Sequence, residues 1–170
     1  QILEKVINTH GAFKNAEVLD YIKAMGYKYS TRAAMTVSIS DMTVPAEKPE
    51  LLAQAQATVD KISTNFRRGL ITEEERYRAV VETWNETDKE LTDKLIGGLD
   101  KYNNIFMMAD SGARGSNQQI KQLAGMRGLM ADTTGRTIEL PIKSNLREGL
   151  DVLEYCMSAP GARKGLSDSA

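Results

Sequence analysis

The sequence predicts a mainly α-helical chain whose central feature is a long antiparallel coiled-coil hairpin. Within residues 47–68, apolar side chains recur at alternating spacings of three and four, as in a coiled-coil seam: Leu52, Ala55, Val59, Ile62 and Phe66. A second seam with the same spacing follows: Tyr77, Val81, Trp84, Asp88, Leu91 and Leu95. Because the second seam can lie against the first, we expect two antiparallel helices of about five turns or more each.

The residues between the two seams carry the signals that end one helix and begin the next. Gly69 suits the left-handed position after a helix C-terminus, and Thr72 with Glu75 forms a capping box. These signals place the tip of the hairpin at residues 67–74. The hairpin can be a plain scaffold, or a docking post whose basic and acidic tip recruits other proteins. For the second use the candidate residues are those of the tip: Arg67, Arg68, Leu70, Ile71, Glu73 and Glu74.

One seam position of the second helix is polar. Asp88 stands where the spacing calls for an apolar residue. We interpret it as a local defect or as a polar residue that sets the register of the two helices, rather than as a catalytic group.

The segment before the hairpin, residues 1–46, is expected to be small and helical. Apolar spacing predicts helices over residues 2–9 and 15–25, separated by Gly11 and with Gly26 as the C-terminal cap of the second. Residues 27–44 are richer in β-branched side chains, and short extended segments or a helical turn both remain open. Asp41 is interpreted as a turn or helix cap rather than a metal ligand.

The segment after the hairpin, residues 101–143, is expected to combine loops with one short helix and one short strand. Apolar residues at spacings of three predict the helix over residues 118–129. Alternation from Thr137 to Ile142, bounded by turn residues and a proline, predicts the strand.

Within this segment, residues 110–130 are basic and rich in glycine, with no acidic residue after Asp110. Their cations are Arg114, Lys121 and Arg127, and their glycines are Gly112, Gly115, Gly125 and Gly128. Small residues let backbone N–H groups and long cations approach the same phosphate oxygens. A loop and short helix packed inside a larger protein is an equally good interpretation of this pattern on its own.

The last segment, residues 144–170, is expected to open a long helix capped by Ser144 or Asn145. Pro160 removes one backbone hydrogen bond and clashes with the preceding turn, at a cost of about 3 kcal/mol in a straight helix. We therefore expect a kink or break near residues 156–160. Gly161 and Gly165 indicate either a weak helix or a close approach to another segment.

Composition excludes several classes of protein. A formal net charge of −1 disfavours an autonomous nucleic-acid-binding module, which usually carries a basic excess. The single cysteine, Cys156, excludes an internal disulfide framework and a multi-cysteine zinc site. No apolar run is long enough for a membrane span, and neither a P-loop nor a dinucleotide fingerprint occurs.

The absence of an initiator methionine at Gln1, and of a helix-stop signal at Ala170, leads us to expect a piece of a longer polypeptide.

Five motifs occur in a fixed order along the second half of the chain. They are Ser111-Gly-Ala-Arg-Gly-Ser116, Gln122-Leu-Ala-Gly-Met-Arg-Gly-Leu-Met130, Leu140-Pro-Ile142, Asn145-Leu-Arg-Glu-Gly-Leu150 and Gly161-Ala-Arg-Lys-Gly165. With them the chain resembles the largest catalytic subunit of multisubunit RNA polymerases, which in bacteria is the β′ subunit. Residues 111–170 match this family closely, and residues 1–110 match it more loosely in pattern and order.

The resemblance implies a place for each segment within a large multidomain subunit. Residues 47–100 correspond to the rim helices of the secondary channel, where transcript-cleavage and other regulatory factors dock. The basic segment within residues 101–143 corresponds to the F loop beside the active centre. Residues 144–170 correspond to the first part of the bridge helix, with Pro160 at a position where the family commonly has histidine.

The resemblance also suggests roles for individual residues. Arg114 and Lys121 are candidates to contact a nucleoside triphosphate or backtracked RNA, and Arg127 is interpreted as a buried structural cation. Arg147, Arg163 and Lys164 are candidates to face nucleic acid or acidic neighbours, the alternative being a solvated or salt-bridged helix face. The expected helix break falls at Pro160 and Gly161.

The catalytic chemistry itself is expected to lie outside these residues. Nucleotidyl transfer needs two divalent metals held by clustered carboxylates, and the family's Asn-Ala-Asp-Phe-Asp-Gly-Asp motif is absent, as is the trigger loop. No catalytic or metal-binding residue is therefore assigned here. The resemblance implies that the whole enzyme uses Mg²⁺, with Zn²⁺ elsewhere in the subunit.

The partners implied are those of a cytoplasmic, nucleoid-associated polymerase: the β, α, ω and sigma subunits, the DNA template, RNA, nucleoside triphosphates and secondary-channel factors, with no membrane. The main alternative is a helical-hairpin docking scaffold or adaptor with no catalytic role. That alternative explains residues 47–100 equally well, but not the recurrence of glycines and cations at residues 111–130 and 161–165.

Overall fold

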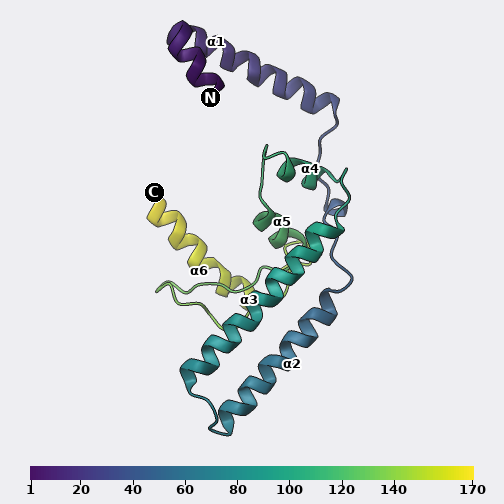
Figure 1. Cartoon of the computed structure of the whole chain (residues 1–170), viewed down its shortest axis with the longest axis vertical. Helices are drawn as coiled ribbons and strands as arrows, with labels where there is room; N and C mark the ends of the chain where they lie inside the picture. Colours follow the sequence, from purple (N-terminus) through teal and green to yellow (C-terminus); the bar gives the residue numbers. More distant parts are fainter. The chain divides into compact units, whose positions relative to one another are not determined.

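The computed structural model describes all 170 residues, which form two compact units, residues 1–37 and 38–170. Six α-helices and one 3₁₀ helix account for the regular structure, and no β-strand is formed (Figure 1). The predicted mainly helical fold class is therefore confirmed. None of the helices combines the length and the apolar composition needed to cross a membrane.

The first unit consists of one helical element, α1 (Ile2–Arg32), and the residues that follow it. Its backbone leaves the helical conformation at Gly11, where φ is 78° and ψ is 175°, so the predicted break there is confirmed. The predicted cap at Gly26 is wrong, because the helix continues to Arg32 and tolerates this glycine inside it. No residue of α1 is buried.

The second unit opens with a 3₁₀ helix, η1 (Ile39–Asp41). The Asp41 carboxylate accepts a hydrogen bond from the Ser38 backbone N–H at 2.7 Å, and the Ser38 hydroxyl accepts one from Ser40. The interpretation of Asp41 as a cap is confirmed. A helical turn, rather than an extended segment, is therefore formed at residues 39–41.

The predicted helical hairpin is formed by α2 (Lys48–Arg67) and α3 (Glu73–Gly98), which lie side by side along their length (Figure 1). Gly69 has a φ of 71° in the turn, a conformation that other residues adopt only at a cost. The Thr72 hydroxyl accepts from the Glu75 N–H at 3.3 Å, and Glu75 accepts from the Thr72 N–H at 2.7 Å. Both predicted turn signals are confirmed.

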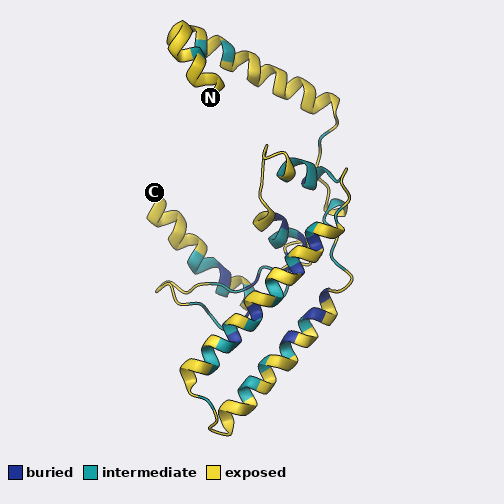
Figure 2. Cartoon of the chain, viewed as in Figure 1, coloured by how far each residue is buried: buried dark blue, intermediate teal, exposed yellow.

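The core follows α3 rather than a separate globular centre (Figure 2). Three buried clusters succeed one another along it: Ala55 with Val80 and Trp84; Leu51 with Leu91 and Met126; and Leu95 with Ile105, Ile120 and Ala124. The last two clusters bring in residues beyond the hairpin. The half of α3 remote from the tip is thus covered by later parts of the chain instead of projecting into solvent.

Two short helices follow the hairpin, α4 (Asn104–Asp110) and α5 (Asn117–Ala124). The helix predicted over residues 118–129 is therefore wrong in its second half. A Cβ on Gly125 would lie 2.9 Å from the carbonyl oxygen of Lys121, which marks how tightly the chain turns out of α5.

Residues 125–151 form no helix and no strand. Only two isolated antiparallel bridges occur, Gly128 with Ile142 and Ala131 with Thr137, so the strand predicted from Thr137 to Ile142 is wrong. Pro141 has no N–H to donate, which prevents a continuous ladder next to the first bridge.

The last helix, α6 (Val152–Ser169), begins later than predicted. Asn145 and Glu148 do exchange the hydrogen bonds of a capping box, but the turn ends at Gly149, where φ is 87°. A second capping box, Asp151 with Glu154, starts α6. Asn145 therefore caps a single turn, and the prediction that it or Ser144 caps the long helix is wrong.

No non-helical break is formed at Pro160 and Gly161, because α6 continues through both residues, and a kink there stays a prediction. Proline leaves the carbonyl of Cys156 without its helical partner. Cys156 is exposed, so water can satisfy that carbonyl, and the loss is confined to one hydrogen bond.

Candidate functional site

The loop that carries Arg114 joins α4 to α5 and is exposed throughout residues 111–116. Gly112 and Gly115 both have positive φ, 70° and 86°, so the loop folds sharply on either side of Arg114. The Arg114 backbone N–H donates to the carbonyl of Met108 at 3.3 Å. Its guanidinium makes no ion pair or hydrogen bond within the chain, and it is therefore free to bind an anion.

Lys121, the other candidate for phosphate contact, is engaged within the chain. Its ammonium group donates to the Asp88 carboxylate at 2.7 Å, and both side chains are largely buried. Asp88 thus occupies its polar seam position as the partner of a cation on α5. A Cβ on Gly128 would lie 3.4 Å from the other Asp88 oxygen, so this carboxylate also lies against the backbone of the following loop. The Lys121 ammonium is therefore engaged in an ion pair within the chain, and its contact with phosphate stays a prediction.

Arg127 lies near the start of residues 125–151, which form no helix or strand and are called the irregular segment below. Its backbone N–H donates to the Ser144 carbonyl at 3.1 Å, and its buried Nε has no hydrogen-bond partner. The partly buried position agrees with the interpretation of Arg127 as a structural cation rather than a phosphate ligand.

The three cations assigned to the last helix are placed differently from one another. Arg147 lies in the turn before α6, not on the helix, and its guanidinium donates to the carbonyl of Met42. Lys164 lies on α6 and donates to the Thr133 carbonyl at 2.8 Å. Arg163 alone is exposed on α6 without an ion pair or side-chain hydrogen bond.

The hairpin tip is open to solvent. Leu70 is 68% exposed, and Arg67 and Arg68 are exposed without acidic partners. Glu73 and Glu74 pair with arginines of the first turns of α3, Arg76 and Arg78. The hydrogen bond from Arg76 holds the pKa of the Glu73 carboxyl below its usual value.

Several long-range contacts hold the irregular segment in place, and the sequence did not indicate the residues that make them. Lys48, with a side chain only 6% exposed, forms an ion pair with Glu148 at 2.7 Å. Burial opposes ionisation of Glu148, but the bonds from Lys48 and from the Asn145 N–H outweigh it and lower the pKa of Glu148. Asn145, fully buried, donates to the Ala124 carbonyl at 3.1 Å. No local sequence signal marks such partners, because they come from distant positions.

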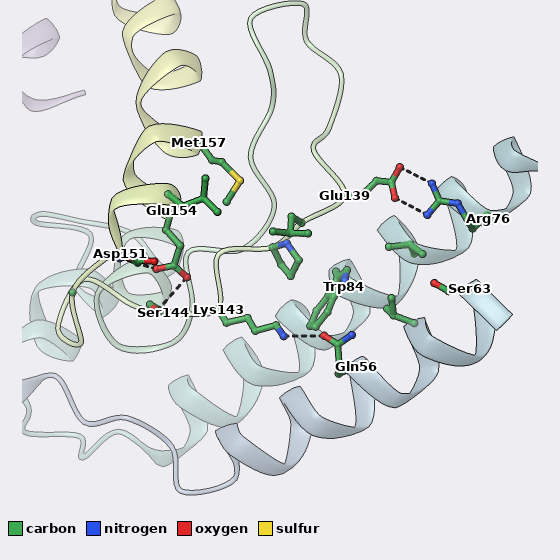
Figure 3. A pocket seen from close by; sticks show the side chains of 16 residues that line it. Gln56, Ser63, Arg76, Trp84, Glu139, Lys143, Ser144, Asp151, Glu154 and Met157 are labelled. Atoms are coloured by element: carbon green, nitrogen blue, oxygen red, sulfur yellow. Dashed lines mark hydrogen bonds and ion pairs between the residues drawn. The ribbon is translucent and has the colours of Figure 1, made fainter. Parts of the chain in front are cut away.

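A groove of about 720 Å³ lies between the hairpin, residues 139–144 and the start of α6 (Figure 3). Trp84 forms part of its wall, with the Lys143 ammonium 5.2 Å from the ring centroid and 2.9 Å from the side-chain oxygen of Gln56. Glu139 faces Arg76 at one end of the groove, and Glu154 and Met157 lie at the other. The groove marks where the hairpin, the irregular segment and α6 meet.

The structure contains no group of three or more histidine, cysteine, aspartate or glutamate side chains that could hold a metal ion. Asp88 is committed to Lys121, and Asp41 to the cap of η1. The donor set required for two-metal nucleotidyl transfer does not fit any place among these residues.

Comparison with known proteins places the segment in a family. The family described as RNA polymerase Rpb1, domain 4, matches residues 71–147. The β′ subunit of the DNA-directed RNA polymerase of Lachnoclostridium phytofermentans is 72% identical over all 170 residues. The chain belongs to the family of bacterial RNA polymerase β′ subunits. The β′ subunits of Caldanaerobacter subterraneus and Clostridioides difficile are 62% and 59% identical over the same 170 residues.

The alignments cover this chain completely, but they cover only a small part of its relatives. The chain is covered over 100% of its length by these three relatives, but it spans only 14% to 15% of theirs. The family resemblance noted from the five motifs is confirmed, and it extends through the N-terminal 110 residues as well.

Proposed function

We propose that this chain works as part of a DNA-directed RNA polymerase, a nucleotidyltransferase that makes RNA on a DNA template. The observation that carries the proposal is the alignment with a β′ subunit, which covers all 170 residues of the chain, the irregular segment included, at 72% identity. In this proposal α2 and α3 form the rim of the secondary channel, the Arg114 loop lines the channel, and α6 is the first part of the bridge helix.

Arg114 is the residue best suited to contact a triphosphate or backtracked RNA. It is exposed, has no intramolecular partner, and lies on a loop with two glycines that allows phosphate oxygens to approach closely. An arginine can give a phosphate two parallel charge-assisted hydrogen bonds. Arg163, which is also unpaired, is the corresponding candidate on α6, whereas Lys121, Arg147 and Lys164 are bound within the chain.

The hairpin tip is proposed as the docking surface for regulatory factors. Its exposed Leu70 offers apolar area, and the unpaired Arg67 and Arg68 offer charge to an acidic partner. Such docking needs no chemistry from the hairpin itself.

The remaining parts of the enzyme are proposed to come from elsewhere. Because no carboxylate cluster is present, the catalytic Mg²⁺ ions and any Zn²⁺ would be held outside these residues. The β, α, ω and sigma subunits, DNA, RNA and nucleoside triphosphates are the partners of the assembled enzyme. The contribution of this segment is to position groups and to shape the channel.

To test the proposal, residues 1–170 of this chain replace the matching segment in the 72% identical β′ subunit. Transcription by the polymerase assembled with this hybrid subunit is then measured. We expect the exchange to preserve RNA synthesis, and Arg114→Glu in the exchanged segment to reduce it or to alter transcript cleavage. Arg78→Glu is the matched control, since Arg78 is an exposed arginine paired only with Glu74. Assembly without RNA synthesis, or equal activity of the two variants, contradicts the proposal.

A further inference from the structure

The loop formed by residues 128–142 is bonded on one side to α3. Two nitrogens of Arg76 donate to the two oxygens of Glu139, at 2.7 and 2.9 Å, in a bidentate pair (Figure 3). The Arg76 side chain is 17% exposed, and its hydrogen bonds, first with Glu73 and then with Glu139, raise the pKa of the guanidinium. The adjacent Tyr77 hydroxyl donates to the Thr137 carbonyl at 2.9 Å. Three hydrogen bonds from two side chains of α3, Arg76 and Tyr77, therefore fasten this arm of the loop to α3.

The same loop touches α6 on its other side. Gly161 of α6 lies so near the loop that a Cβ there would be 2.8 Å from the Ala131 carbonyl oxygen. Lys164 donates to the Thr133 carbonyl at 2.8 Å, and Ser158, on the preceding turn of α6, is buried. A glycine at position 161 is thus required by the close approach of the two backbones.

The two sides of the loop are joined to each other by backbone hydrogen bonds. The Asp132 N–H donates to the Arg136 carbonyl and the Ile138 N–H to the Met130 carbonyl, both at 2.8 Å. A displacement of the Glu139 arm is therefore passed to the Ala131 arm. The larger helix–helix contacts of this chain, α2 with α3 and α3 with α5, do not include α6, whereas α6 approaches the loop at Gly161 and Lys164.

We propose that Arg76 and Glu139 are positioning residues for α6: they fasten loop 128–142 to α3, and the loop in turn seats α6 at Gly161. An exposed ion pair would carry little weight, but this one is bidentate, partly buried and continuous with the Tyr77 bond. Its importance for RNA synthesis rests on the proposed function, in which α6 belongs to the bridge helix. The seating of α6 does not depend on that function.

The chain contains a matched control for this pair. Glu73 accepts hydrogen bonds from the same guanidinium, with Arg76 Nε at 2.9 Å, but it lies on α3 itself and has no hydrogen bond or ion pair with the loop. Its one link to the loop is the electrostatic attraction of Arg136. Glu73→Gln and Glu139→Gln thus remove the same charge from the same arginine. Only the second change cuts the connection to α6.

Hydrogen exchange of the full 170-residue chain, followed by mass spectrometry, tests the proposal. We expect Glu139→Gln to speed exchange roughly three- to tenfold in residues 128–142 and 157–164, the range for loss of one charge-assisted pair. Glu73→Gln should leave both regions unchanged, and the exchanged pair Arg76→Glu with Glu139→Arg should restore protection. Faster exchange confined to the loop, or spread equally over α2, α4 and α5, overturns the proposal.

A second measurement separates this inference from the proposed function. In the assembled polymerase, Glu139→Gln should lower the rate of nucleotide addition at saturating triphosphate and leave KM unchanged, because the pair positions α6 and does not bind substrate. If exchange in α6 responds but the rate does not, Arg76 and Glu139 still position α6 and its assignment to the bridge helix fails. If α6 does not respond, the positioning role fails whatever the rate.

Discussion

The helical hairpin and the irregular segment 125–151 are stabilised in different ways. In the hairpin, the capping box and the turn glycine act within a few residues of one another, and the seam repeats along both helices. In the irregular segment, the ties join positions far apart: Lys48 with Glu148, Arg76 with Glu139, and Asn145 with Ala124. The hairpin is thus specified by local periodicity, and the irregular segment by individual long-range bonds.

The largest expected effect lies where the two regions share a core. Leu91 is fully buried between Leu51 of the hairpin and Met126 of the irregular segment. Leu91→Ala should lower the free energy of unfolding by about 2–5 kcal/mol, measured by urea denaturation, because it leaves a cavity in the core that the two regions share. The exposed Leu70→Ala is the control and should stay within about 0.5 kcal/mol of wild type. Equal losses would mean that the two regions share no core.

A smaller effect is expected from the buried amide that ties the irregular segment to α5. Asn145→Ala leaves the Ala124 carbonyl and the Glu148 N–H without their partners. Unfolding in urea should show a loss of about 1–3 kcal/mol, the usual cost of stranding buried polar groups. A loss below about 0.5 kcal/mol would indicate that this segment is held mainly by its apolar contacts.

The corresponding change in the hairpin affects a local signal. Thr72→Ala removes the side-chain half of the capping box and should cost about 1 kcal/mol in the same urea experiment. The bonds from Thr72, the backbone N–H first and the hydroxyl second, lower the pKa of Glu75, so NMR titration of the variant should show that pKa rising. An unchanged Glu75 pKa would show that the hydroxyl does not contribute.

The smallest expected effect is a dependence on pH at the Lys48–Glu148 pair. Since the pKa of Glu148 is lowered in the folded chain, its ion pair adds stability that is complete above the ordinary value of 4.5 and is lost as pH falls through the folded pKa. Glu148 is partly exposed, so the contribution should be below about 1 kcal/mol. Glu148→Gln should flatten the stability profile below pH 4.5, and an unchanged slope there would contradict the assignment.

The sequence predicted the parts of the fold that obey local rules. The helical hairpin, the turn at Gly69, the capping box at Thr72 and the break at Gly11 are all present. The predicted seams are only partly right, because Leu51 and Val80 are buried next to the predicted Leu52 and Val81, and Phe66 is 38% exposed. The errors fall where two local signals compete. At residues 145–154 two capping boxes follow each other; the first turn ends at Gly149, and the long helix begins at the second box. At Pro160 the loss of one hydrogen bond does not end a helix that is otherwise intact.

The candidate site was predictable only in part. Arg114, which has a glycine on either side of it in the loop, is exposed and unpaired, and its contact with phosphate stays a prediction. Lys121 binds Asp88, 33 residues away in the sequence, and Arg147 binds the carbonyl of Met42, 105 residues away. No periodicity in the sequence predicts partners at such separations. Whether a surface cation is free or committed is decided by tertiary structure.

Crosslinking can test the proposed position of the Arg114 loop beside the active centre of an RNA polymerase. A photoreactive amino acid is placed at position 114 in assembled polymerase that carries this segment, with the exposed position 70 at the hairpin tip as the control. We predict crosslinks from position 114, but not from position 70, to the 3′ end of RNA in backtracked complexes or to bound triphosphate. Crosslinks from neither position, in complexes that synthesise RNA, would contradict the account.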